Sequence, residues 1–206
     1  MTDPVPDGLT TARVEAFSDG VLAIAATVLV FGLAVPPPGR DVATAVVEEV
    51  PAIAAYAVSF LTILIFWVNH HALFAAIQRV DRGVLFLNGL ILLCISFIGY
   101  PTQILGRTLR GDGSGRAASV LYAAVLALAS AAFTTLWAYL HSRPQLLHPA
   151  RRAGTGAALR RSLVGPGLYT AALVVGLVHA GAALVVCALV AAYFALPPRV
   201  FRWARP

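Results

Sequence analysis

The 206-residue chain has few charged residues and no lysine at all. Charged residues make up 12% of the sequence, whereas 59% of the residues are hydrophobic. All fifteen basic residues are therefore arginine, and only nine residues are acidic. This balance excludes a soluble globular domain and is typical of a membrane protein.

Other missing patterns exclude further classes of function. The two cysteines, Cys94 and Cys187, both lie in apolar runs, so we expect neither a structural disulfide nor a metal pair. The sequence has no His-x-x-x-His pair beside a carboxylate cluster and no Ser-His-Asp set at one depth, so we predict no metal, no cofactor and no enzyme activity. The net charge of +6 comes without a basic–aromatic patch, so nucleic acid is not an expected partner.

Long apolar runs dominate what is present. A helix needs about 20 residues to cross a bilayer core of about 30 Å. The last run, Leu163–Leu196, has 34 residues and would form a helix of about 51 Å, so we expect two short helices that meet near His179. The chain is predicted to be an all-α membrane protein, one domain with six transmembrane helices. The approximate spans are 14–35, 52–77, 84–105, 117–140, 162–178 and 180–197.

The positions of the arginines predict the orientation. Six spans place eleven arginines on the side of the N-terminus and four on the other side, whereas five spans give eight and seven. Because cytoplasmic loops are enriched in positive charge, we expect six spans in the cell membrane with both termini cytoplasmic. The loop His141–Ser162 carries arginine pairs at 151–152 and 160–161. We interpret these pairs as topology determinants, and a contact with anionic membrane lipids is the alternative.

Asp19 is the acidic residue that the sequence places inside an apolar span, at the start of the run Gly20–Val35. A carboxylate at that depth is costly and requires a polar partner. Counted from the flanking arginines, Asp19 and Asn88 lie about 9 Å, and His70 about 13 Å, inside the cytoplasmic edge. We therefore predict a buried polar network at one depth. Its expected members are Asp19, Trp67, Asn69, His70, His71 and Asn88.

Two interpretations of this network remain open. In the first, which we favour, it is a clamp in which Asp19 accepts a hydrogen bond from a histidine, from the Trp67 indole or from the Asn88 amide. In the second, Asp19 and a histidine form a proton relay. Adjacent residues on a helix point about 100° apart, so at most one of His70 and His71 is expected to join the network.

The first span also carries an apolar stripe. Ile24, Val28 and Phe31 recur at i, i+4 and i+7, with Thr27 at the border of the stripe. Periodicity alone favours lipid contact or helix packing for such a stripe.

Residues 13–27 contain Arg-x-x-x-Phe-Ser-Asp-Gly-Val and then Ala-Ile-x-x-Thr. The second span contains Phe66-Trp67-x-x-His70-His71-x-x-Phe74, and the third contains Leu87-Asn88 and Tyr100-Pro101. Together these motifs resemble the transmembrane-protein-175 family of potassium channels, in its prokaryotic branch. The resemblance covers residues 13 to 102.

The resemblance implies a homotetramer in the membrane whose first helices line a central pore for potassium ions. No Thr-Val-Gly-Tyr-Gly filter is present, and the family's ring of isoleucine at the narrow point corresponds to Ile24. The resemblance further places Thr27 beside this constriction and Val28 and Phe31 in rings beyond it, although Phe31 replaces a leucine-like residue. It adds residues to the network that holds the pore helix: Arg13, Phe17 and Ser18, with His70 or His71 as the participating histidine.

The resulting hypothesis is a potassium-permeable cation channel of limited selectivity, in which an apolar ring strips water from the ion. A proton-coupled or proton-conducting transporter that uses Asp19 and a histidine is the main alternative, although the chain shows no inverted repeat. An accessory membrane protein without a pore is a second alternative.

Overall fold

The computed structural model describes residues 10–109 and 115–195. Within these ranges all regular structure is helical, apart from an isolated antiparallel bridge between Ile77 and Leu147. The predicted all-α class is therefore confirmed. The elements in chain order are α1 (Thr11–Val28), η1 (Leu29–Gly32), α2 (Val42–Phe74), α3 (Arg82–Phe97), α4 (Gly99–Leu109), α5 (Gly115–Ser142), η2 (Pro144–Leu146), η3 (Pro149–Gly154), α6 (Thr155–Ser162), α7 (Val164–Gly176) and α8 (Ala180–Ala195).

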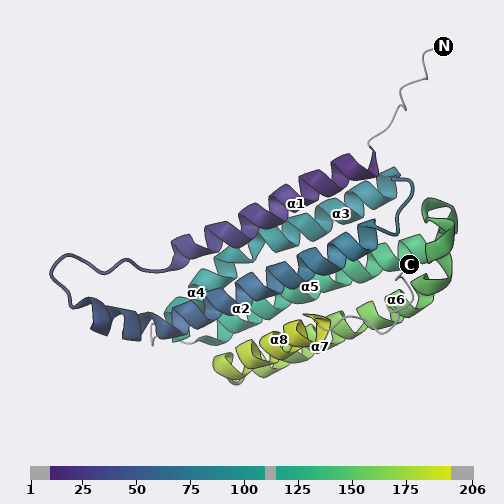
Figure 1. The fold of residues 1–206 in the computed structure, drawn as a ribbon. Helices are drawn as coiled ribbons and strands as arrows, with labels where there is room; N and C mark the ends of the chain where they lie inside the picture. Colours follow the sequence, from purple (N-terminus) through teal and green to yellow (C-terminus); the bar gives the residue numbers. More distant parts are fainter. Residues whose placement is uncertain (1–9, 110–114, 196–206) are drawn as a thin grey trace, which may run out of the picture.

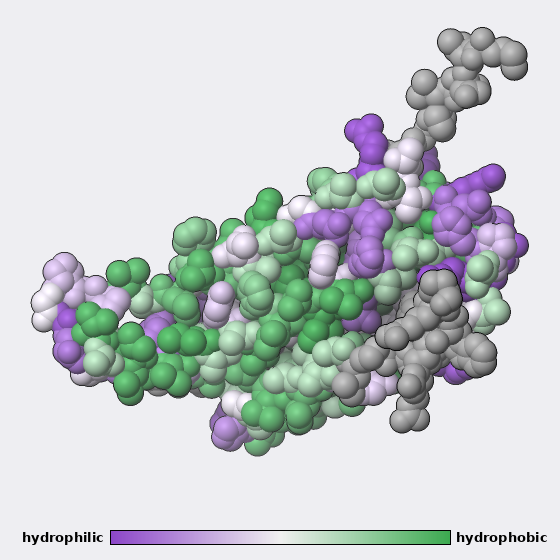
Figure 2. Space-filling view, in the orientation of Figure 1, coloured by the Kyte–Doolittle hydropathy of each residue, from purple (hydrophilic) through white to green (hydrophobic). Residues whose placement is uncertain are grey.

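The helices form an elongated bundle whose members run along one common direction (Figure 1). Four segments are long and apolar enough to cross a membrane: Thr11–Gly32, Val42–Phe74, Arg82–Leu109 and Gly115–Ser142. Figure 2 shows apolar residues over the middle of the visible face and hydrophilic residues gathered toward its two ends. This distribution matches a bundle embedded in a bilayer.

The last apolar run forms two helices, as its length predicts. Helix α7 ends at Gly176 and α8 begins at Ala180, and His179 Nδ1 accepts a hydrogen bond from the Ala182 N–H at 3.1 Å in the turn between them. On the other side, only Leu163 separates α6 from α7, and its backbone angles are helical (φ −61°, ψ −23°). Segments α6 and α7 are thus nearly continuous, and with α8 they form the last two helical segments of the described bundle.

Two segments differ in detail from the predicted spans. Helix α2 begins at Val42 rather than at residue 52, because Asp41 caps it by accepting the Thr44 N–H at 2.8 Å. Its 33 residues make a helix of about 50 Å, so it extends beyond the bilayer core. The third segment is broken at Ile98, between α3 and α4. Pro101 explains the break. In a continuous helix its ring would clash with the Phe97 carbonyl, four residues earlier, and it has no N–H to donate to that carbonyl.

Helix α5 forms the centre of the bundle. It packs against α3, α4, α6, α7 and α8 and is the most buried of the four long segments. Near the N-terminal end of α5, Tyr122 joins a buried cluster of hydroxyl groups: Ser59 Oγ lies 3.0 Å from Tyr122 OH and 2.8 Å from Thr102 Oγ1. This cluster connects α2, α4 and α5 where no water is available to replace a lost hydrogen bond. Helix α1, in contrast, lies at the edge and packs against α2 and α3 (Figure 1).

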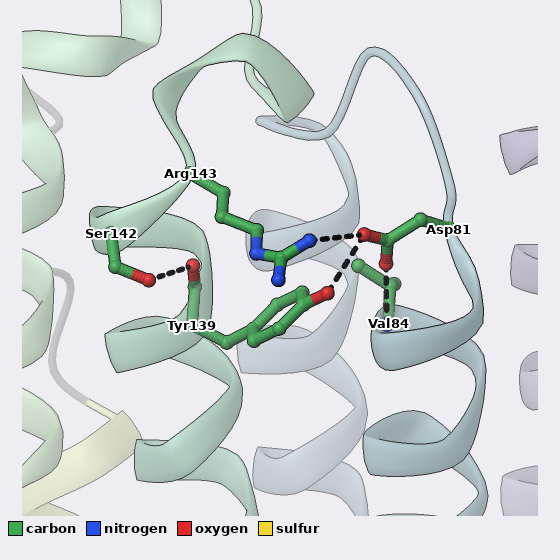
Figure 3. A network of polar contacts seen from close by, with 5 residues as sticks. All are labelled: Asp81, Val84, Tyr139, Ser142 and Arg143. Carbon is green, nitrogen blue, oxygen red and sulfur yellow. Dashed lines mark hydrogen bonds and ion pairs between the residues drawn. The ribbon is translucent and has the colours of Figure 1, made fainter.

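A second polar cluster, around Asp81, lies at the end of the bundle where α3 begins and α5 ends (Figure 3). We call this the arginine-rich end, because the sequence places Arg79, Arg82 and Arg143 in or beside these helix ends. Asp81 caps α3 by accepting the Val84 N–H at 2.9 Å, and its other carboxylate oxygen accepts the Tyr139 hydroxyl at 2.7 Å. Arg143 lies 3.4 Å from that same oxygen and 4.7 Å from the centre of the Tyr139 ring. Asp81 thereby ties the start of α3 to the end of α5.

These contacts favour the charged form of Asp81. Burial raises the pKa of this carboxyl, but hydrogen bonds from Val84 and Tyr139 and the charge of Arg143 outweigh that effect, so the pKa lies below its ordinary value of 3.8. The stabilisation from Asp81 is therefore complete above about pH 4 and is lost as the pH falls through the lowered pKa.

We predict that Asp81→Asn lowers the stability of the folded protein by about 1 kcal/mol at neutral pH. Asparagine keeps the cap on α3 but loses the charged acceptor for Tyr139 and Arg143. Thermal unfolding in detergent between pH 7 and pH 3 measures the effect, and the difference from the natural chain should shrink below about pH 4. A difference that is the same at every pH would contradict the assigned role of the carboxylate.

Candidate pore helix and its polar contacts

Helix α1 has one buried and one exposed face. The buried positions recur every three or four residues, which places them on one side of a helix: Val14, Ser18, Leu22, Ala25 and, on η1, Leu29. Large apolar residues also occupy the opposite side, where they stay exposed in the single chain. Phe31 is 82% exposed and Ile24 is 63% exposed. An apolar face of this kind needs either lipid or another protein surface to cover it.

All four predicted pore residues lie on this exposed face. Ile24, Thr27 and Val28 are exposed residues of α1, and Phe31 lies on η1, where the helix tightens to a 3₁₀ turn. The Thr27 hydroxyl donates to the Ile24 carbonyl at 3.0 Å, so its oxygen lone pairs face away from its own backbone. The structure thus presents the four side chains together on the side of α1 that points away from the rest of the bundle.

The buried face carries a directional chain of hydrogen bonds through three helices. The Ser18 hydroxyl donates to the Val14 carbonyl at 2.8 Å, which leaves its oxygen to accept from Asn88 Nδ2 at 2.9 Å. The Asn88 amide oxygen then faces His70 Nε2 at 2.8 Å. Because that oxygen only accepts, His70 carries its proton on Nε2. Ser18, Asn88 and His70 are all buried, and together they fix α1 against α3 and α2.

His70 also packs against an aromatic ring. Its imidazole stacks on Phe74, with ring centres 4.3 Å apart. The second ring nitrogen, Nδ1, is buried and has no hydrogen-bond partner in the part of the chain that the structure describes. The histidine is thus held in one orientation by Asn88 on its edge and Phe74 on its face.

Two further contacts join α1 to α2 closer to the surface. The Trp67 indole N–H donates to Asp19 Oδ1 at 2.9 Å, and His71 Nδ1 lies 2.8 Å from Glu15 Oε1. The rings of Trp67 and His71 stack with centres 6.4 Å apart. Both aromatic side chains are more exposed than His70, which is 1% exposed. The polar layer thus has a buried part around Asn88 and an outer part around Asp19.

The structure brings together most of the predicted polar residues but changes their pairing. Asp19 accepts from Trp67, and neither His70 nor His71 contacts it. Each histidine has its own partner because the two rings point to different sides of α2. Asn69 does not join the layer: its amide donates to the Ile65 carbonyl of its own helix at 2.7 Å and to the Phe194 carbonyl on α8 at 3.5 Å.

Two residues that the family resemblance placed in this network lie outside it. The side chains of Arg13 and Phe17 are exposed on α1, and Phe17 is 66% exposed. Phe17 instead precedes Ile24 by two turns on the exposed apolar face, since seven residues span nearly two helical turns. Only the backbone of Arg13 has a described polar contact, with Thr10 at the helix start.

Sequence reasoning missed two acidic residues. Glu15 faces His71, and its spacing of four residues from Asp19 on one helix would have indicated a shared side. Glu49 was assigned to a loop, but it lies on the extended α2, is 8% exposed and accepts the Ala34 N–H at 3.0 Å. Asp19 is therefore not alone among the acidic residues of these helices in having a polar partner, although Glu49 lies before the predicted apolar span 52–77. The hydropathy pattern assigns Glu49 to a loop, because this residue lies in the polar first turns of α2, before the apolar part that crosses the membrane.

The described residues offer no group of three or more His, Cys, Asp or Glu side chains that would hold a metal ion. Polar contacts hold one face of α1 against the bundle, and the other face presents an exposed apolar surface. A clamped helix with such a surface can assemble with copies of itself or line a path through the bilayer.

Comparison with known proteins agrees with this arrangement. Residues 13–99 match the family model described as the endosomal/lysosomal potassium channel TMEM175. The chain is 40% identical to a potassium channel of Streptomyces collinus over 190 residues, which covers 89% of this chain and 91% of that protein. It is also 30% identical over 157 residues to the endosomal/lysosomal proton channel TMEM175 of Danio rerio, but covers only 30% of that longer protein.

The fold has a solved counterpart as well. The crystal structure of a lysosomal potassium-selective channel TMEM175 homolog from Chamaesiphon minutus superposes with a TM-score of 0.82 at 32% identity, covering 90% of this chain and 96% of that one. The sequence match begins at Arg13 and includes α1, α2 and α3, the helices that carry the polar layer. The chain belongs to the TMEM175 family of ion channels.

Proposed function

We propose that the chain forms a potassium-permeable cation channel as a homotetramer in the cell membrane, with both termini cytoplasmic. The observation that carries this proposal is the exposed apolar face of α1, because a membrane-spanning helix that is clamped on one side has only this face with which to meet other copies. Fourfold symmetry would bring four such faces around one axis. The potassium channel of Streptomyces collinus, at 40% identity, supports the choice of ion.

Ile24 is the proposed constriction. It is 63% exposed and lies about one and a half turns beyond Ser18 and Asp19 of the polar layer, where the helix is still regular. Four isoleucine side chains around an axis form an apolar ring with no ligand for an ion, so a permeating cation sheds water there. Potassium loses its hydration more easily than sodium, which gives selectivity of limited extent. The Thr27 hydroxyl, one turn further along the helix, offers oxygen to the partly dehydrated ion.

We predict that Ile24→Asn increases ion flux and reduces discrimination between potassium and sodium, because amide groups replace part of the lost hydration. Flux into liposomes that contain the purified protein, measured separately with each ion, tests this. Val30→Asn is the matched control, since it introduces the same group on another side of the same segment. Unchanged flux and selectivity in Ile24→Asn would show that Ile24 does not line the path.

The polar layer is proposed as a clamp that holds the pore helix and does not itself contact the ion. Asn88 is central to it because its amide donates to Ser18 on α1 and accepts from His70 on α2. Loss of this amide leaves buried polar groups on both neighbouring helices without a partner.

We predict that Asn88→Ala destabilises the folded protein by about 1–3 kcal/mol, the cost of an unsatisfied buried polar group. Ser96→Ala, on the same helix, is the control, because the exposed Ser96 hydroxyl bonds to the Leu93 carbonyl of its own helix, and its effect should stay within about 0.5 kcal/mol. Thermal unfolding in detergent measures both. Equal losses of folding stability in the two variants would contradict the proposed role of Asn88 in the clamp.

Proton conduction is the second candidate function, favoured by the name of the Danio rerio relative. The contacts of Asp19 and Asn88 argue against a relay through Asp19, because Asp19 bonds to an indole and the Asn88 amide separates Ser18 from His70. The carboxylate–imidazole pair of the layer, Glu15 with His71, lies at its exposed side. A neutral amide and an indole hold their hydrogens firmly and do not relay protons as a carboxyl–imidazole pair does.

A pH-sensitive dye inside liposomes distinguishes the two candidates. The channel proposal predicts that potassium flux persists at a clamped pH and that Asp19→Asn, which keeps an acceptor for the Trp67 indole, leaves any proton flux unchanged. Abolition of a proton flux by Asp19→Asn, with potassium flux intact, would favour the proton-conducting alternative.

A further inference from the structure

The end of the pore helix that lies away from the polar layer needs contacts of its own. Helix α1 ends at Val28, η1 follows it directly, and Leu33 then has an extended backbone (φ −83°, ψ 136°). The contact between Ser18 and Asn88 lies ten residues before Val28, a rise of about 15 Å. A hydrogen bond at that distance does not fix the winding of the single turn in η1.

The winding of η1 determines where Phe31 points. In an α-helix a residue three positions further on lies about 60° away around the axis, whereas in a 3₁₀ helix three residues complete one turn. Phe31 follows Val28 by three residues through the 3₁₀ turn, so the two side chains lie nearly in line. Both are exposed, Val28 by 40% and Phe31 by 82%. The 3₁₀ turn therefore keeps Phe31 on the exposed apolar face.

A buried carboxylate holds the chain where it leaves this turn. Glu49 on α2 is 8% exposed, and its Oε1 accepts the Ala34 N–H at 3.0 Å, two residues after η1 ends. Hydrogen bonds from a backbone N–H to a carboxylate are stronger than those to a neutral acceptor. The preceding residue, Glu48, is exposed and pairs instead with Arg40.

Apolar and backbone contacts place η1 close to its neighbours. Leu29 is 2% exposed, and η1 packs against both α2 and α4. A Cβ atom at Gly32 would lie 2.5 Å from Gln103 Cγ on α4, so glycine allows this close approach. These contacts bring η1 against the bundle, and the Glu49 carboxylate fixes the point at which the chain departs from it.

We propose that Glu49 is a positioning residue for the part of the ion path beyond Val28. By accepting the Ala34 N–H it keeps η1 wound, and the wound turn keeps Phe31 in line with Val28. This role rests on the proposed function, in which the exposed face of α1 lines the path. Two contacts then set the two parts of the pore helix: Asn88 sets the rotation at Ile24, and Glu49 sets it at Phe31.

Hydrogen exchange of the full chain in detergent, measured by mass spectrometry, tests the Glu49 contact without any ion flux. Glu49→Leu should speed exchange in residues 29–35 about tenfold, the ratio expected for loss of a hydrogen bond to a charged group, and leave residues 18–25 unchanged. Glu48→Leu, at the preceding position, is the matched control and should change neither region. Equal changes in the two variants, or none in Glu49→Leu, would overturn the assignment.

Two conservative variants separate the acceptor from the charge, and they carry the test if Glu49→Leu does not fold. Glu49→Gln keeps an oxygen at the same reach and should exchange nearly as the natural chain does. Glu49→Asp keeps the charge but is one methylene shorter, so it should resemble Glu49→Leu. The opposite order would assign the effect to charge and overturn the contact with Ala34.

Potassium flux into liposomes tests the effect on the ion path. In a chain with Cys94 and Cys187 replaced by alanine, a charged thiol reagent should block flux at both Ile24→Cys and Phe31→Cys. Adding Glu49→Leu should remove the block at Phe31→Cys and leave the block at Ile24→Cys.

Three results of the flux measurement would contradict the role of Glu49. A block that persists at both positions in Glu49→Leu, or is lost at both, would overturn separate control of the two parts. A block at Ile24→Cys alone with Glu49 in place would show that Phe31 does not line the path. Flux that persists after complete modification of Ile24→Cys would instead overturn the proposed channel, whereas the exchange result would still test the Glu49 contact.

Discussion

The amide of Asn88 determines how α1 sits in this protein. It lies where the bilayer supplies no water, so every polar group around it has to be satisfied by protein. Its two ends are distinct, since the nitrogen donates to Ser18 on α1 and the oxygen accepts from His70 on α2. A rotation of α1 by about 100°, the angle between successive residues, would break the hydrogen bond between Ser18 and Asn88. The direction in which Ile24 points is therefore set by a contact on the other side of the helix.

The polar contacts around Asn88 connect two structural parts of the chain. Helix α5 and the helices around it form a frame, connected by the hydroxyl cluster at Ser59 and Tyr122 and by the Asp81 cluster at the arginine-rich end. Helix α1 lies at the edge of the frame and is attached through the polar layer. A channel needs such a division. The helix beside the ion path must keep a fixed rotation, while its exposed face stays free of contacts with the rest of its own chain.

Sequence patterns predict the large features because hydropathy determines them. The four long apolar segments, the hairpin at His179 and the common depth of Asp19, His70 and Asn88 all follow from apolar run length and helix rise. The pairing within the polar layer does not follow, because it depends on helix rotation and side-chain direction. Asp19 with Trp67 and His71 with Glu15 are contacts of that kind. Glu49 was missed for another reason: a helix that extends beyond the bilayer has a polar start that hydropathy assigns to a loop.

The proposed channel depends on the exposed face of α1 lining the ion path at Ile24. Ile24→Cys, made in a chain with Cys94 and Cys187 replaced by alanine, tests it directly with a charged thiol reagent during potassium flux into liposomes. We expect modification of Ile24→Cys to block the flux, whereas the cysteine-free chain should be unaffected by the reagent. Complete modification of Ile24→Cys with undiminished flux would contradict it.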